Sequence, residues 1–85
     1  MSHHQTNFSG DIHEAIRAAV TTRLADAIVE VKGGGGHWSL VVTSAAFAGK
    51  SMLEGHRLVL SALAPLMAGD APPVHAVDSL VTRTP

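Results

Sequence analysis

The sequence predicts a small α+β domain with the element order α-β-β-α-α-β, in which helices cover one face of a three-stranded mixed sheet. Apolar residues recur at helical spacing in two segments, β-branched residues gather in three others, and the chain has 85 residues. A chain of this length is one domain, too short for a Rossmann or barrel enzyme of about 200 residues or more. Residues 1–10 are polar, so we expect a flexible leader before a single domain over residues 11–85.

The segment over residues 11–26 has the pattern of an amphipathic helix. Asp11 is a suitable N-cap residue, and Glu14 stands where a capping box places its acidic side chain. Apolar residues recur at the spacing of one helix face: Ile12, Ile16, Ala19, Val20 and Leu24. This face is predicted to be buried.

Two strands joined by four glycines follow the first helix. Residues 28–32 and residues 37–44 are rich in β-branched side chains and partly alternating. Gly33 to Gly36 are expected to form a flexible connection, because glycines have no side chains to pack and lose much entropy on ordering. The whole segment predicts a β-hairpin. Its glycines could also cradle an anion through backbone N–H groups, although a hairpin linker is favoured.

The segment that follows predicts a connection and a longer helix. Residues 45–50 connect the second strand to this helix, and Phe47 is the expected anchor of the connection. Ser51 and Glu54 stand at capping-box spacing, which predicts that the helix occupies residues 52–64.

Proline and glycine divide the last third of the chain. Pro65 disfavours a helix interior and suits the first position of a short helix over residues 65–68. Residues 69–73 have the composition of a turn, and residues 74–81 form the third predicted strand.

The composition excludes several classes of protein. The chain has no cysteine, which excludes a disulfide scaffold, a Cys-ligated zinc finger and a thiol nucleophile. Six Lys and Arg against seven Asp and Glu give a net charge of −1, and the basic residues are dispersed along the chain. Apolar runs are too short to span a membrane, and residues 1–10 lack the apolar core of an export signal. We therefore expect a cytoplasmic protein.

One short motif resembles part of a nucleotide-binding loop. Residues 48–51 read Ala-Gly-Lys-Ser, as at the end of a P-loop, but Ser44 stands where that loop needs its first glycine. A turn followed by a helix cap is therefore favoured over nucleotide binding. No G-x-S-x-G element presents a serine nucleophile, so nothing predicts a hydrolase.

Histidine is the residue type with the most chemical interest, since the chain has six. His37 opens the second predicted strand and His75 lies near the start of the third. If these strands are parallel neighbours, both imidazoles lie at the same end of the sheet. Such a pair suits a metal or cluster held partly by another chain, because two ligands are too few for a closed site. The alternative is that both are ordinary strand-end histidines.

Several motifs occur in a defined order from Ile16 to Pro85. They are Val29-Glu30-Val31, a glycine loop ending in His37-Trp38, Val41-Val42, Phe47-Ala48-Gly49-Lys50-Ser51, His56-Arg57-Leu58-Val59, Val74-His75-Ala76-Val77 and Thr82-Arg83-Thr84-Pro85. In this combination and order the sequence resembles the BolA family. The resemblance implies the class II KH-like fold, whose α-β-β-α-α-β order agrees with the order predicted from the residues.

The resemblance implies a role other than that of an enzyme. BolA-like proteins pair with monothiol glutaredoxins in iron–sulfur cluster assembly, trafficking or iron regulation, and the pair can bridge a [2Fe–2S] cluster with thiolates from glutaredoxin and glutathione. One ligand of the BolA-like chain is the histidine before an Ala-hydrophobic pair, which corresponds to His75. The other comes from the loop between the first two strands, as His or Cys, and His37 is the candidate here.

A second function implied by the resemblance is transcriptional regulation through DNA binding. Its candidate residues are Lys50, Arg57 and Arg17, which could form a basic contact surface. We rank it second because the chain is nearly neutral and its glycine loop joins two strands, whereas the KH glycine loop joins two helices. No membrane partner is expected, and a weak homodimer is left open.

Overall fold

The structure, a computed structural model, describes residues 11–85, so the expected leader over residues 1–10 lies outside the described residues. The elements are α1 (Ile12–Arg23), β1 (Ile28–Gly34), β2 (His37–Thr43), the 3-10 helix η1 (Ala45–Phe47), α2 (Met52–Leu63), the 3-10 helix η2 (Ala64–Leu66) and β3 (Ala76–Arg83). The α+β class and the order of elements are confirmed.

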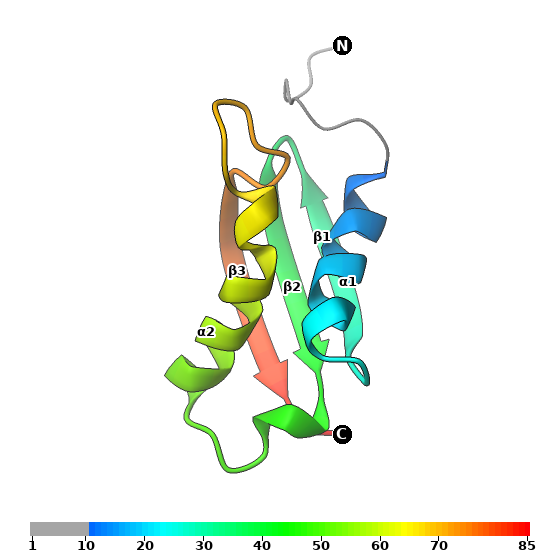
Figure 1. Cartoon of the computed structure of the whole chain (residues 1–85), viewed down its shortest axis with the longest axis vertical. Helices are drawn as coiled ribbons and strands as arrows, with labels where there is room; N and C mark the ends of the chain where they lie inside the picture. Colours follow the sequence, from blue (N-terminus) through cyan, green and yellow to red (C-terminus); the bar gives the residue numbers. More distant parts are fainter. Residues whose placement is uncertain (1–10) are drawn as a thin grey trace.

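The sheet has the strand order β1-β2-β3, with β2 in the centre. β1 pairs with β2 in the antiparallel direction, and β2 pairs with β3 in the parallel direction, so the predicted mixed sheet is confirmed. Both helices lie on the same face of this sheet (Figure 1). The opposite face carries exposed residues such as Glu30, Lys32 and Val81.

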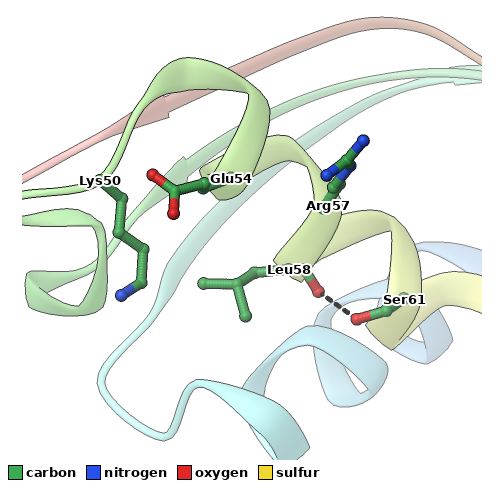
Figure 2. A pocket seen from close by; sticks show the side chains of 5 residues that line it. All are labelled: Lys50, Glu54, Arg57, Leu58 and Ser61. Atoms are coloured by element: carbon green, nitrogen blue, oxygen red, sulfur yellow. Dashed lines mark hydrogen bonds between the residues drawn. The ribbon is translucent and has the colours of Figure 1, made fainter.

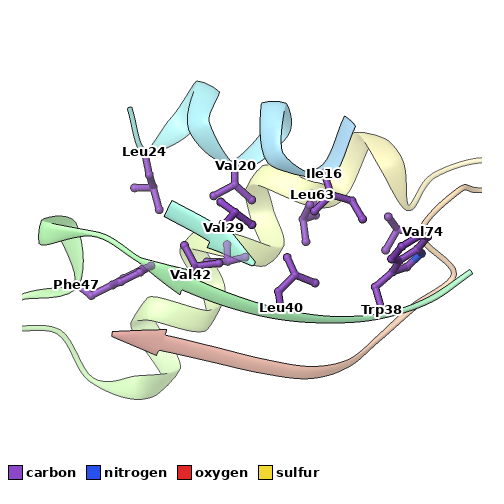
Figure 3. Packing of buried hydrophobic residues seen from close by; sticks show 11 residues of the cluster. Ile16, Val20, Leu24, Val29, Trp38, Leu40, Val42, Phe47, Leu63 and Val74 are labelled. Carbon is purple, nitrogen blue, oxygen red and sulfur yellow. The ribbon is translucent and has the colours of Figure 1, made fainter. Parts of the chain in front are cut away.

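The hydrophobic core lies between the helices and the covered face of the sheet (Figure 3). The predicted buried face of α1 supplies Ile16, Val20 and Leu24, while Ile12 and Ala19 pack at its margin. The remaining buried members are Val29, Trp38, Leu40, Val42, Phe47, Val59, Leu63 and Val74. Burial of these side chains is the main source of stability in a domain of this size.

The first helix begins as predicted and ends earlier than predicted. Asp11 caps it by accepting hydrogen bonds from the backbone N–H groups of His13 and Glu14. Glu14 has a different role from the expected one, because its carboxylate accepts a hydrogen bond from Arg17. The helix ends at Arg23 rather than at residue 26.

The early end of α1 frees Asp26 for a contact with the distant residue Ser44. The Ser44 hydroxyl donates to one carboxylate oxygen of Asp26 at 2.6 Å, and the backbone N–H of Ala45 donates to the other at 2.8 Å. Ser44 is fully buried and also accepts from the N–H of Ala46 as the cap of η1. These bonds, first that from Ser44 and then that from Ala45, hold the pKa of the Asp26 carboxyl below its ordinary value of 3.8.

The four glycines are divided between strand and turn, so the prediction of one continuous connection is wrong. Gly33 and Gly34 belong to β1 and pair with Trp38 and His37. Gly35 and Gly36 alone form the turn, with φ of +61° and +85°. Two successive residues with positive φ define the turn type that matches the right-handed twist of a hairpin, and glycine adopts it without strain.

The boundaries of the last elements differ from the predictions by one or two residues. The capping box of Ser51 and Glu54 is confirmed, as is Phe47 as a buried anchor. Pro65 lies inside η2, a single 3-10 turn over Ala64–Leu66. The third strand begins at Ala76 and extends to Arg83, so His75 directly precedes it.

Substitution of Gly33 by alanine should destabilise the fold. Its φ is +133°, and an added Cβ would collide with the carbonyl oxygen of His37 and lie 3.0 Å from Cα of Trp38. We expect G33A to lose at least about 2 kcal/mol of unfolding free energy in urea titration. The control is G34A, whose Cβ meets no atom within 4 Å, and whose change should stay within about 0.5 kcal/mol. Equal losses in both variants would contradict this assignment.

The Asp26 contact predicts a specific acid sensitivity. A carboxyl with a lowered folded-state pKa stabilises the fold above its ordinary value of 3.8, and this stabilisation disappears as pH falls through the lower folded value. We therefore expect the unfolding free energy of D26N to depend less steeply on pH than that of the wild type, below about pH 5. E30Q, which removes an exposed carboxylate from the open sheet face, is the control. A D26N profile parallel to the wild type would disprove the prediction.

Candidate functional site

His37 and His75 lie side by side at one end of the sheet. His37 pairs with Ala76 in the parallel β2–β3 ladder. Because His75 directly precedes Ala76, the pairing brings His75 beside His37. The imidazole ring centres are 5.7 Å apart, and the ring planes are inclined by 52°. The expectation that parallel strands bring both histidines to the same end of the sheet is confirmed.

A carbonyl in the glycine turn holds the start of β3 in place. The carbonyl oxygen of Gly36 accepts hydrogen bonds from the backbone N–H groups of both His75, at 2.8 Å, and Ala76, at 3.0 Å. Gly36 is buried, although it belongs to a turn. The backbone positions of His37 and His75 are therefore tied to each other through one shared acceptor.

Trp38 anchors the segment that leads to His75. Its indole Nε1–H donates to the carbonyl oxygen of Pro73 at 3.1 Å in a buried position. Val74 is fully buried beside it (Figure 3), and its N–H donates to the carbonyl of Leu66. An edge-on contact between Trp38 and the ring of His13 in α1, with centres 4.9 Å apart, brings a third histidine to this end of the molecule.

Asp78 is a residue of this site that the sequence patterns did not indicate. Its carboxylate oxygen Oδ1 lies 3.2 Å from Nδ1 of His37. Both side chains are more than half exposed, at 55% for Asp78 and 57% for His37. Asp78 lies at an irregularity in the β2–β3 register, which no residue spacing reveals.

The donor set fits a metal centre that receives its other ligands from elsewhere. Within residues 11–85, no group of three or more His, Asp or Glu side chains is arranged to hold a metal ion. Metals bind imidazole nitrogens at about 2.0–2.1 Å, which puts the centres of two rings on one tetrahedral metal roughly 5 Å apart. The distance of 5.7 Å between His37 and His75 is close to this value. Both rings are also exposed at this end of the sheet, where a second chain can reach them.

Two of the three basic candidates for nucleic-acid binding line one hollow. Lys50 and Arg57 line a hollow of about 410 Å³ together with Glu54, Leu58 and Ser61 (Figure 2). Arg17 lies on α1, where its side chain donates to the carbonyl of Val29 and to the Glu14 carboxylate. The structure therefore brings Lys50 and Arg57 together, beside an acidic side chain, and directs Arg17 to β1.

One known protein family matches most of the chain. The family model described as BolA-like protein matches residues 15–85 of the chain. The chain belongs to the BolA-like family. BolA-like protein 1 of Homo sapiens is 34% identical over 86 residues, which cover 89% of this chain and 60% of that protein. The chain thus spans about three fifths of the length of the curated relatives it matches.

Solved structures of the BolA-like family have the same fold. The BolA domain of SufE1 from Arabidopsis thaliana is 29% identical with a TM-score of 0.73, over 92% of this chain and 96% of that domain. The solution structure of BolA1 from Mus musculus is 33% identical with a TM-score of 0.69, over 100% of this chain and 76% of that one. Among residues 11–85 of this BolA-like chain, no helix has the length and apolar character to cross a membrane.

Trp38→Phe should loosen the segment before His75. The substitution removes the indole donor and leaves the buried carbonyl of Pro73 without it, which typically costs about 1–3 kcal/mol. We expect a lower unfolding free energy and faster hydrogen exchange at the amides of His75 and Ala76. Ser39→Ala, one residue along β2, is the control. Unchanged exchange at both amides would show that Trp38 does not anchor this segment.

Proposed function

We propose that this BolA-like chain is a partner of a monothiol glutaredoxin and binds a shared [2Fe–2S] cluster through His37 and His75. The observation that carries the proposal is the approach of the two imidazoles, whose centres are 5.7 Å apart on adjacent parallel strands. Membership of the BolA-like family supports it, because such pairing is what the sequence resemblance implies. The role is one of binding and transfer rather than catalysis, and we propose the cytoplasm as its location.

In this proposal the chain and its glutaredoxin partner supply different kinds of ligand atom to the cluster. This chain has no cysteine, so it offers imidazole nitrogens, and the thiolates come from glutaredoxin and glutathione. Histidine ligands in place of thiolates would raise the reduction potential of a [2Fe–2S] centre relative to an all-thiolate centre. In this proposal His37 and His75 present two imidazole nitrogens at a fixed spacing at the exposed end of the sheet. The backbone bonds at Gly36 maintain that spacing.

A DNA-binding role has less support from the described surface. Lys50 and Arg57 share a hollow, which is the observation in its favour, but Glu54 lies in the same lining. Arg17 is engaged with β1 and Glu14 and adds no charge to that hollow. Phosphate binding depends on clustered positive charge, and two cations beside a carboxylate give little of it.

Replacement of His75 by alanine should alter the cluster shared with the partner. The wild-type chain, a monothiol glutaredoxin and glutathione are mixed with iron and sulfide without oxygen, and visible circular dichroism is recorded. We expect a spectrum that differs from that of glutaredoxin alone, and we expect H75A and H37A each to remove this difference. His75 supplies one nitrogen donor and His37 the other, so each loss changes the ligand set.

The matched control is His56→Ala, which removes an imidazole from α2. His56 is far from the site, since the adjacent Gly55 packs near Thr82, at the end of β3 away from His75. H56A should therefore give the wild-type spectrum. A wild-type mixture whose spectrum equals that of glutaredoxin alone would exclude the proposal, and an unchanged spectrum for H75A would exclude His75 as a ligand.

A further inference from the structure

A β-bulge in β3 adds Asp78 to the open face of the sheet. Trp38 pairs with Val77, and the next residue, Ser39, pairs with Ser79, so Asp78 is the extra residue. Val77 packs against the core, and regular alternation would turn Ser79 toward the core as well. Ser79 instead lines the open face with Ser39. The extra residue resets the alternation for the residues that follow it. The exposed carboxylate of Asp78 stands at the bulge, next to His37.

The contact between Asp78 and His37 determines which ring nitrogen carries the proton. A neutral imidazole has one N–H donor and one acceptor nitrogen, and a carboxylate only accepts. Oδ1 of Asp78 lies 3.2 Å from Nδ1 of His37, so the hydrogen bond requires the proton on Nδ1. The lone pair is then on Nε2. Histidines that bind metals commonly donate their other N–H to a carboxylate in this way, which sets both the tautomer and the ring orientation.

We propose that Asp78 is a positioning residue that holds His37 with its proton on Nδ1 and so reserves Nε2 as the nitrogen offered to the cluster. The proposal rests on the proposed function of His37 as a ligand. The backbone of the neighbouring His75 is placed by the hydrogen bond from its N–H to the carbonyl of Gly36. The ring of His37 is placed by its contact with the carboxylate of Asp78.

We expect the fold to tolerate replacement of Asp78, because the side chain is exposed. Its side chain is 55% exposed and its partner 57%, and exposed pairs of this kind contribute little to stability. D78N keeps an oxygen that can accept from Nδ1, whereas D78A removes the acceptor. S79A, the adjacent residue on the same face, is the matched control.

The first measurement is the tautomer of His37 in the isolated chain. Proton–nitrogen correlation spectra of the rings are recorded at about pH 8.5, where an ordinary imidazole is neutral, and H37A assigns the signal. We expect the Nδ1–H form to predominate in the wild type, D78N and S79A, and the Nε2–H form to become the major one in D78A. A wild-type ring that is mainly Nε2–H, or a D78A ring unchanged from wild type, would overturn the proposal.

The second measurement uses the anaerobic mixture with glutaredoxin and glutathione. D78A should shift the circular dichroism toward that of H37A, and D78N should restore the wild-type spectrum. A D78A spectrum identical to wild type would overturn the role of Asp78 at the cluster. Failure of the proposed function appears separately, as the absence of any new spectrum with the wild-type chain, while the tautomer of His37 is measured without a partner.

Discussion

The parallel pairing of β2 with β3 is the constraint on which the rest of the structure depends. It joins segments that are distant in the sequence, and bringing them together costs entropy that local contacts do not recover. The carbonyl oxygen of Gly36 offsets this entropy cost at one end of the ladder, because it accepts hydrogen bonds from the backbone N–H groups of His75 and Ala76. Because the acceptor lies in the hairpin turn itself, the register of β3 is set relative to β2 where the two histidines stand. A shift of one residue would separate them.

The opposite end of the same ladder is closed by a different polar arrangement. The N–H of Ser44 donates to the carbonyl of Arg83, and the Ser44 hydroxyl donates to Asp26, which lies between α1 and β1. Hydrogen bonds to neighbouring segments therefore fix both ends of the central strand β2. Its middle is fixed by side chains that pack in the hydrophobic core. A strand fixed in this way is a rigid support, and exposed side chains at its start keep a defined spacing without being buried.

Helical periodicity, β-branched runs and glycine or proline breaks were sufficient to predict both α-helices and all three strands, because each is a local property of the chain. The features missed by that reading are non-local. Asp26 leaves the first helix to reach Ser44, and Gly33 and Gly34 pair with a strand instead of forming a loop. The site shows the same division. The condition of parallel pairing was enough to predict that His37 and His75 lie at the same end of the sheet, whereas Asp78 lies at a bulge that only the paired strands reveal.

The exposure of the histidine pair is the property that suits it to a shared ligand. A histidine buried in the core would be held firmly, but a second chain could not reach it, and its polar atoms would need internal partners. At the end of the sheet, backbone bonds hold the main chain of both histidines in place and the imidazoles remain accessible. The two histidines proposed as cluster ligands are not among the side chains that form the hydrophobic core. The proposed function and the packing of the fold therefore depend on different residues. A chain without cysteine can thus contribute to a sulfur-rich centre by offering two well-placed nitrogens and leaving the thiolates to its partner.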